Sequence, residues 1–495
     1  MTRKSVLSAV VSIFGGKVVV MLIGILSTPI IARLLGSDGY GAYASILAVF
    51  GLTQILMSSG ISSASQAYFS RSRGPEWVDQ VWGFLFRVAG AFALLAGAAF
   101  AAFAYFGLAA HFFGPDFTNY FYLLAVYAVA LQYSTYVRRV LMGLQLEKFS
   151  EPLTVIKRGT FAVVAVALAY FGYGVGGVLI GHIVSCILIF TVGLWFLRNH
   201  VNLSSVARRT PNDFPSRDLL TYNLQSTVVV LFFSSLYHVD VLMLQGFVSE
   251  SQIGIYKAAL VLVEFLWLVP QSVQWALIQR VSDYWEYDEL SEISAVATRA
   301  TQYVSLLTIL LALGLAALAD TVVPLYYGRE YSEAVTPLLI LLPGTAALAI
   351  GRPLFGITKA SEKLRPLIAA TGFTAGLNLI LNAVLIPQYG VNGAAAASTA
   401  GYAALPVSMV VCAWYLNYRP VNWNNAIRIL AVSMVAGPVI LWLGGQLDGL
   451  ISLLVVPPVG GLIFLILSIV FGAFPRDDIR EVLDKVQDHL GQDFV

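Results

Sequence analysis

The sequence predicts an all-α membrane protein whose helices cross the bilayer about fourteen times. Of its 495 residues, 58% are hydrophobic and 11% are charged, and the mean hydropathy is +0.79. In a soluble protein about a quarter of the residues are charged. Because the deficit of charge extends over the whole chain, a soluble enzyme domain of ordinary size is excluded.

The predicted crossings are apolar stretches of the length that a bilayer requires, about 20 helical residues. Along the chain they are 7–32, 41–62, 81–107, 118–144, 155–172, 176–198, 219–245, 253–279, 300–323, 333–351, 366–387, 391–416, 426–445 and 450–472. The connections are mostly short and are often marked by Gly, Asp or Asn, as at 37–39, 172–174 and 388–390. The first stretch follows two basic residues as in a signal peptide, but no convincing cleavage site ends it, so we expect a retained helix.

The basic residues predict how these helices are oriented. With a cytoplasmic N-terminus, 24 of the 29 Lys and Arg residues fall in cytoplasmic segments and three fall on the outer side. Arg158 and Arg352 are counted among the cytoplasmic ones, while Lys17 and Arg87 lie within spans. Cytoplasmic loops of membrane proteins carry such an excess. We therefore expect an even number of crossings with both termini in the cytoplasm.

Three motifs recur in the same order, which indicates an internal duplication. The matched segments are 41–44 with 254–257, 139–143 with 352–356, and 173–177 with 389–393, at offsets of 213, 213 and 216 residues. The repeat contains six crossings, an even number, so both halves are expected to cross the membrane in the same sense. They would then be related by a pseudo-two-fold axis along the membrane normal.

The duplication predicts four segments: an N-terminal six-helix lobe at 1–210, a C-terminal six-helix lobe at 211–418, two further helices at 419–474, and a cytoplasmic amphipathic tail at 475–495. In transporters built from two such halves, the substrate site lies between the halves and opens to either side in turn.

Three longer motifs carry a family resemblance: 29–43 (PIIARLLGSDGYGAY), 239–243 (VDVLM) with 254–256 (GIY), and 377–393 (LNLILNAVLIPQYGVNG). With them the chain resembles the Wzx-like flippases, the polysaccharide-transporter branch of the multidrug/oligosaccharidyl-lipid/polysaccharide exporter superfamily. The resemblance implies two six-helix lobes that form a V-shaped cavity. It also implies that an oligosaccharide on a polyprenyl or dolichyl phosphate or pyrophosphate is flipped from the cytoplasmic to the outer leaflet, while the last two helices help to hold the lipid tail.

Basic residues within or beside the predicted spans are candidate ligands for the carrier phosphate. An ionised side chain at mid-span costs about 2.5–3.5 kcal/mol on insertion scales, so a functional role is the default interpretation. Lys17 lies near mid-depth of the first span, Arg87 about two turns into the third span, and Arg33 at an outer helix end. The alternative for Lys17 is a bond to carbonyls of a neighbouring helix. For Arg87 and Arg33 it is snorkelling to the headgroups.

Polar residues on the seventh predicted span form a stripe. Asn223, Thr227, Ser234 and His238 fall within about 60° of each other at the helical period. They are expected to face inward, where they either bind sugar hydroxyls or bond one helix to another.

The eighth predicted span carries Lys257, Glu264 and Gln271, which recur every seven residues and so share one helix face. Gln271 is a further candidate for the polar cavity lining. Glu264, Lys257 and Asp240 are candidates for coupling transport to H⁺ or Na⁺. An ion pair is the alternative for Glu264, and a bond to a neighbouring helix is the alternative for Asp240.

No motif predicts catalysis or a bound cofactor. A G-x-x-x-x-G-K-[ST] loop is absent from the sequence, and the Cys and His residues do not cluster at metal-ligand spacing. Transport is therefore expected to use an ion gradient, the membrane potential or removal of the product. The net charge of +2 gives no reason to expect nucleic acid as a partner. The expected partners are the lipid-linked glycan, membrane lipids and, as an open alternative, glycan-assembly proteins.

Three rival functions follow from the same pattern. A multidrug/cation antiporter of the same superfamily would need a cavity dominated by acidic residues. A membrane-bound glycosyl-transfer enzyme would need clustered acids facing one leaflet, and the sequence contains no such cluster. A non-transporting scaffold for glycan assembly would tolerate Lys17→Ala in an export assay. We expect a flippase in a prokaryotic cytoplasmic membrane.

Overall fold

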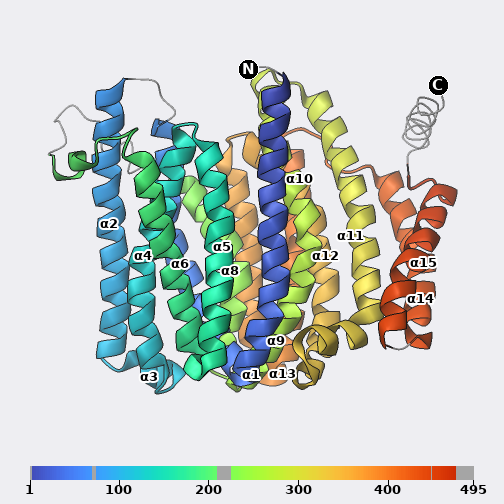
Figure 1. The fold of residues 1–495 in the computed structure, drawn as a ribbon. Coiled ribbons are helices and arrows are strands. Elements are labelled where there is room, and N and C mark those ends of the chain that lie inside the picture. Colours follow the sequence, from blue (N-terminus) through green and yellow to red (C-terminus); the bar gives the residue numbers. More distant parts are fainter. Residues whose placement is uncertain (1–2, 70–73, 209–223, 448, 475–495) are drawn as a thin grey trace, which may run out of the picture. The chain divides into compact units, whose positions relative to one another are not determined.

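The computed structural model describes residues 3–69, 74–208, 224–447 and 449–474. Within these ranges the structure describes only the backbone of residues 3–15, 17, 59–60, 62–64, 66–67, 75, 224 and 226. Every regular element of the described residues is a helix (Figure 1). The predicted all-α class is therefore confirmed. The chain divides into two compact units, 1–257 and 258–495.

The first unit is a bundle of long helices that lie side by side (Figure 1). Its helices are α1 (Arg3–Phe69), α2 (Pro75–Tyr105), α3 (Leu108–Phe113), α4 (Phe117–Gly143), α5 (Glu147–Leu168), α6 (Gly174–Leu197), α8 (Leu224–Leu244) and the start of α9 (Glu250–Glu264). The π-helical turn η1 (Ala169–Tyr173) joins α5 to α6, and the 3-10 turn η2 (Leu203–Ala207) follows α6. One core of this unit lies where α2, α4 and α6 meet, around Trp82, Tyr136 and Ile189.

Two connections expected in this unit are breaks in a helical run rather than loops. The predicted loop at 37–39 is helical, and α1 departs from helical geometry at Gly36, with φ 68° and ψ 174°. Between α5 and α6 the chain turns at Gly172 and Gly174, whose φ values are 87° and 51°. Glycine reaches positive φ without steric cost, so the chain changes direction there within very few residues.

The second unit contains the end of α9, the 3-10 turn η3 (Phe265–Trp267), α10 (Leu268–Glu286), α11 (Leu290–Tyr327), the 3-10 turn η4 (Arg329–Ala334), α12 (Val335–Ala360), α13 (Leu364–Tyr415), α14 (Trp423–Gln446) and α15 (Gly449–Val470). Helix α13 covers two predicted spans and is broken at Gly390, where φ is 55°. Its two arms pack antiparallel: Asn378 Nδ2 donates to the Ala397 carbonyl at 3.4 Å, and Cys412 Sγ to the Pro366 carbonyl at 3.4 Å. The break therefore forms a helical hairpin.

Helices α14 and α15, which correspond to the two predicted extra spans, pack on α11 within the second unit. Their shared core contains Leu306 of α11, Val432 and Ile440 of α14, and Val456 and Phe464 of α15. The predicted tail at 475–495 lies outside the described residues.

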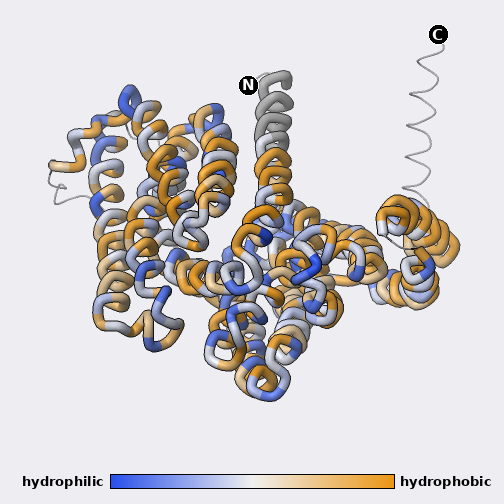
Figure 2. Tube along the Cα trace, turned by 60° about the horizontal axis from the view of Figure 1, so that its bottom comes forward, coloured by the Kyte–Doolittle hydropathy of each residue, from blue (hydrophilic) through white to orange (hydrophobic). Residues whose placement is uncertain are grey.

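The helices expose large apolar side chains on their outer faces. Figure 2 shows hydrophobic residues along most of the helical segments. Leu95 is 69% exposed, Val163 70% and Leu454 75%. Exposed apolar surface of this extent would drive aggregation in water, whereas lipid tails cover it at no cost. Ten helical stretches of the described residues are long and apolar enough to cross a membrane. The chain is thus a multi-pass membrane protein, while the number fourteen and the lobe boundaries stay predictions.

Candidate functional site

The three predicted phosphate ligands occupy different places in the first unit. The Lys17 side chain lies outside the described residues. Arg33 is exposed near the break in α1. Arg87 of α2 is half-buried, and its Nη1 donates to the carbonyl oxygens of Val206 at 2.8 Å and Arg208 at 2.6 Å. Arg87 thus fastens the segment after α6 to α2, and the role of all three in phosphate binding stays a prediction.

The predicted polar stripe on α8 is described in part. Asn223 lies outside the described residues, and Thr227, Ser234 and His238 are half-buried. His238 lies against α1, because a Cβ added at Gly51 would be 2.6 Å from its Nε2. At least His238 of the stripe therefore faces another helix of the first unit. Contact of the stripe with a sugar stays a prediction.

Asp240 is fully buried at the end of α8. Its carboxylate accepts a hydrogen bond from the Tyr256 hydroxyl on α9 and another from the Val241 amide at 2.8 Å. The carboxylate therefore joins α8 to α9, and its role in ion coupling stays a prediction.

The predicted stripe on the eighth span is interrupted. Lys257 and Glu264 are half-buried and Gln271 is exposed. Glu264 ends α9, and the turn η3 separates it from α10. Pro270 lacks the amide hydrogen that would bond to the carbonyl four residues earlier, which accounts for the break in the α-helical ladder here. Gln271 and Glu264 are therefore not on one continuous α-helix.

A cluster that the sequence did not indicate surrounds His182 of α6. Its Nε2 lies 2.8 Å from the Tyr43 hydroxyl of α1, and its Nδ1 lies 3.4 Å from the Tyr127 hydroxyl of α4. The Phe161 ring of α5 stacks on the imidazole at 4.0 Å between ring centres. Four helices thus contribute to one arrangement of rings and hydroxyls. A neutral imidazole accepts a hydrogen bond on one ring nitrogen and donates on the other, and a hydroxyl can serve either role.

Arg158 of α5 extends this cluster with a cation. Its Cζ lies 5.5 Å from the centre of the Phe161 ring. It also lies against Gly24 of α1, where an added Cβ would be 2.9 Å from Nη2. The side chain is half-buried, and among the described residues it has no hydrogen-bond or ion-pair partner. Its N–H groups are therefore available to a ligand.

Together these residues form what we call the Arg158 cluster: Tyr43, Tyr127, Arg158, Phe161 and His182. The cluster contains one permanent cation and no carboxylate. A guanidinium binds phosphate through paired hydrogen bonds, and aromatic rings with hydroxyl groups suit the apolar faces and hydroxyls of a sugar. The cluster therefore suits an anionic ligand better than a cationic one, and its contact with a phosphate or a sugar stays a prediction.

Close to the break in α1, the backbones of α1 and α9 touch. A side chain at Gly41 would collide with the Glu250 carbonyl, and one at Gly254 with the Ser37 carbonyl. Gly41 and Gly254 are the first residues of the first pair of repeated motifs. The Ser251 hydroxyl donates to the Ser37 hydroxyl at 2.7 Å. This contact, here called the glycine contact, holds α1 against α9 near the break in α1.

The second unit contains a buried cation that the charge pattern placed in a cytoplasmic segment. Arg352 of α12 is 3% exposed, and its Nη1 donates to Gln274 Oε1 at 3.2 Å. Its guanidinium lies 5.2 Å from the Trp267 ring. Arg352 therefore joins α10 to α12 inside this unit. No group of three His, Cys, Asp or Glu side chains in the described ranges could hold a metal ion.

The fold is shared with transporters of the multidrug/oligosaccharidyl-lipid/polysaccharide exporter superfamily. The chain is similar to the lipid II flippase MurJ in an inward closed conformation, with a TM-score of 0.73 and 15% identity over 93% of this chain and 98% of that one. It is also similar to an inward-facing multidrug resistance MATE family transporter, with a TM-score of 0.66 and 13% identity over 80% and 94% of the two chains. At these identities the likeness is one of fold.

The sequence narrows the class. A family model described as polysaccharide biosynthesis protein matches residues 30–336, so the chain belongs to that family, and the resemblance in its motifs is confirmed. The chain is also 25% identical, over 246 residues, to the probable low-salt glycan biosynthesis flippase Agl15 of Haloferax volcanii. This match covers 47% of the chain and 50% of the relative, so the chain spans about half the length of the curated relative that it matches.

Proposed function

We propose that the protein is a flippase that moves a lipid-linked oligosaccharide across the cytoplasmic membrane. The glycan is carried on a polyprenyl or dolichyl phosphate or pyrophosphate, and both chain termini lie in the cytoplasm. Membership of the polysaccharide biosynthesis family supports this function, as does the likeness to a flippase of glycan biosynthesis. Such a substrate is an anion that has a polar sugar at one end and an apolar tail at the other.

The placement of Arg158 is the observation that carries the proposal. Gly24, which contacts its guanidinium, lies twelve residues before Gly36, or about 18 Å along α1 at 1.5 Å per residue. A bilayer core is about 30 Å thick, so with Gly36 at one surface the guanidinium is well inside it. A cation at that depth is costly unless it is paired, and the phosphate of the lipid carrier supplies the charge that the cluster lacks.

The glycan would pass through the protein interior while the tail stays in the bilayer. The Arg158 cluster binds the phosphate and the first sugar, and the glycine contact keeps the site closed at that end. Opening the glycine contact and closing the opposite end then exposes the site to the other leaflet, which is alternating access. An H⁺ or Na⁺ gradient that acts through Glu264, Asp240 or Lys257 is one source of energy. No step makes or breaks a covalent bond, so the protein is a transporter and not an enzyme.

The test is transbilayer movement in vesicles that contain the purified protein and a fluorescent lipid-linked oligosaccharide. An impermeant quencher reports how much label has reached the outer leaflet. The wild type is expected to bring labelled lipid to the quencher faster than protein-free vesicles do. Arg158→Ala removes charge-assisted hydrogen bonds of about 1.5–3 kcal/mol each, so it is expected to slow movement at least tenfold. Arg158→Lys keeps the charge, so its rate is expected to lie between those of the wild type and Arg158→Ala.

Arg280→Ala is the matched control, because it removes an exposed arginine of α10 and is expected to leave the rate unchanged. A rate for Arg158→Ala equal to that of the wild type would remove Arg158 from the substrate site. Vesicles with the wild type that behave as protein-free vesicles do would favour a scaffold for glycan-assembly proteins. A cationic dye that moves faster than the glycan would favour the multidrug/cation antiporter.

A further inference from the structure

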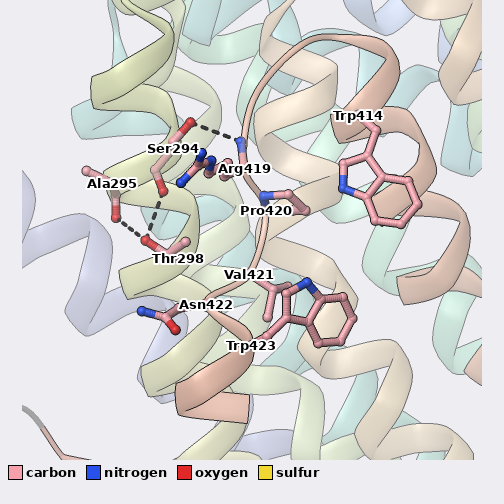
Figure 3. Close-up of a pocket in the computed structure, with 9 residues that line it drawn as sticks. All are labelled: Ser294, Ala295, Thr298, Trp414, Arg419, Pro420, Val421, Asn422 and Trp423. Atoms are coloured by element: carbon pink, nitrogen blue, oxygen red, sulfur yellow. Dashed lines mark hydrogen bonds between the residues drawn. The ribbon is translucent and has the colours of Figure 1, made fainter. Parts of the chain in front are cut away.

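A pocket of about 560 Å³ lies in the second unit between α11 and the segment that joins α13 to α14. Its lining residues are Ser294, Ala295, Thr298, Trp414, Arg419, Pro420, Val421, Asn422 and Trp423. Figure 3 shows two walls: Ser294 and Thr298 of α11 face Arg419 on one side, and the indoles of Trp414 and Trp423 stand on the other side of Pro420. None of the transport residues named above lines this pocket.

The segment that carries Arg419 is held in place by local bonds. The Arg419 amide donates to Ser294 Oγ at 3.0 Å, which ties the segment to α11. Asn422 Oδ1 accepts from the amides of Asn424 at 3.1 Å and Asn425 at 3.4 Å, which caps the start of α14. Pro420 restricts the backbone between these two points. The pocket is therefore preformed.

The pocket contains hydrogen-bond donors, one of them the charged Arg419 side chain, and no acidic side chain that would balance that charge. Within the described part of the chain the Arg419 guanidinium makes no hydrogen bond or ion pair, and the indole nitrogens of Trp414 and Trp423 have no acceptor. No carboxylate lines the pocket. A guanidinium and two indoles donate and do not accept, so the complementary ligand is an anion rich in acceptors.

The two tryptophans indicate the depth of the pocket in the membrane. Trp414 is 59% exposed and Trp423 is 62% exposed, at the end of one long apolar helix and the start of the next. Exposed tryptophans at helix ends mark the headgroup layer of a bilayer. The anions concentrated in that layer are lipid phosphates.

We propose that this pocket binds the phosphate of an anionic membrane lipid. The phosphate is held by the Arg419 guanidinium, and the adjoining glycerol or sugar lies in the remaining space beside the two indoles. The site shares no residue with the Arg158 cluster. It does not depend on the direction or the substrate of transport.

Native mass spectrometry of the purified full-length protein in detergent tests the proposal. The probes are phosphatidylglycerol, phosphatidylcholine, a polyprenyl phosphate and soluble glycerol phosphate. The wild type is expected to retain an anionic lipid at concentrations at which phosphatidylcholine is lost. Arg419→Ala is expected to weaken that binding about tenfold, and Arg419→Lys by less, because lysine keeps the charge without the paired donors. Arg280→Ala is the matched control and is expected to bind as the wild type does.

The arms of the experiment separate the sources of the phosphate. A preference for phosphatidylglycerol identifies a bilayer lipid, and a preference for the polyprenyl phosphate identifies the carrier; either supports the proposal if Arg419→Ala weakens that binding about tenfold. Equal retention of phosphatidylcholine and phosphatidylglycerol would overturn it, as would full displacement of the lipid by glycerol phosphate. Unchanged lipid binding by an Arg419→Ala protein that elutes as the wild type does on gel filtration would also overturn it.

Discussion

At the level of single residues, the proposed phosphate binding depends on how Arg158 is held. The guanidinium lies near the Phe161 ring of α5 and against Gly24 of α1, so both helices determine where the charge lies. The guanidinium can lie in this position because Gly24 has no side chain. A larger residue there would move the guanidinium without removing it.

Gly24→Leu is therefore expected to slow transbilayer movement of the lipid-linked oligosaccharide about tenfold, because displacing the guanidinium removes about one charge-assisted hydrogen bond to the phosphate. Gly24→Ala is expected to have a smaller effect, since a long side chain can shift slightly around one methyl group. The measurement is the initial rate of quenching in vesicles. Gly314→Leu on α11 is the control, because no atom lies within 4 Å of a Cβ added there. A Gly24→Leu protein as fast as the control would show that the guanidinium position does not matter.

The sequence alone did not reveal Arg158, and the reason is geometric. The predicted fifth span begins at 155, which places Arg158 at the cytoplasmic edge. Helix α5 begins at Glu147, so Arg158 comes eleven residues, or about 16 Å, into the helix. Because the residues at the start of α5 are polar, the hydropathy pattern did not mark this part of the helix as part of a span. His182 gave no pattern at all, because its partners Tyr43 and Tyr127 are far away in the sequence.

At the scale of elements, glycine decides where helices turn and where they touch. The breaks at Gly36 and Gly390 lie next to the short connections that the sequence predicted, so the positions of the spans could be predicted well. The form of the connections could not be predicted, because a turn of one or two residues and a longer loop have the same hydropathy. The hairpin of α13 shows the consequence: its arms pack directly against each other near the turn.

Gly393→Ala is expected to destabilise that hairpin by about 1–3 kcal/mol, the usual cost of overpacking, because its Cβ would collide with the Leu385 carbonyl. Gly376→Ala on the same helix has no atom within 4 Å of the new methyl group and is expected to be neutral or stabilising by up to about 1 kcal/mol. Thermal unfolding in detergent, followed by tryptophan fluorescence, measures both. A higher melting temperature for Gly393→Ala than for Gly376→Ala would contradict the packing described for α13.

At the scale of the whole molecule, the fold class and the family could be predicted from the sequence, since hydropathy, charge asymmetry and three motifs depend on composition and local pattern. The family match over residues 30–336 confirms that part. The contact that the repeated motifs make could not be predicted in the same way. Their glycines give the glycine contact between α1 and α9, which becomes visible only when distant segments are brought together.

In the proposed function the protein moves a lipid-linked sugar by opening and closing the glycine contact. The Ser37 and Ser251 hydroxyls are 2.7 Å apart, so cysteines at these positions can reach disulfide distance. The native Cys186 and Cys412 are free and buried, and they would be replaced by serine or alanine in the background protein. The measurement is transbilayer movement of labelled lipid-linked oligosaccharide in vesicles that contain the Ser37→Cys/Ser251→Cys protein, before and after reduction.

Oxidation is expected to stop movement, a reductant is expected to restore it, and each single-cysteine protein is expected to be insensitive to both treatments. Movement at the wild-type rate by the fully cross-linked protein would rule out the proposed mechanism, because the glycan would then cross without opening the glycine contact.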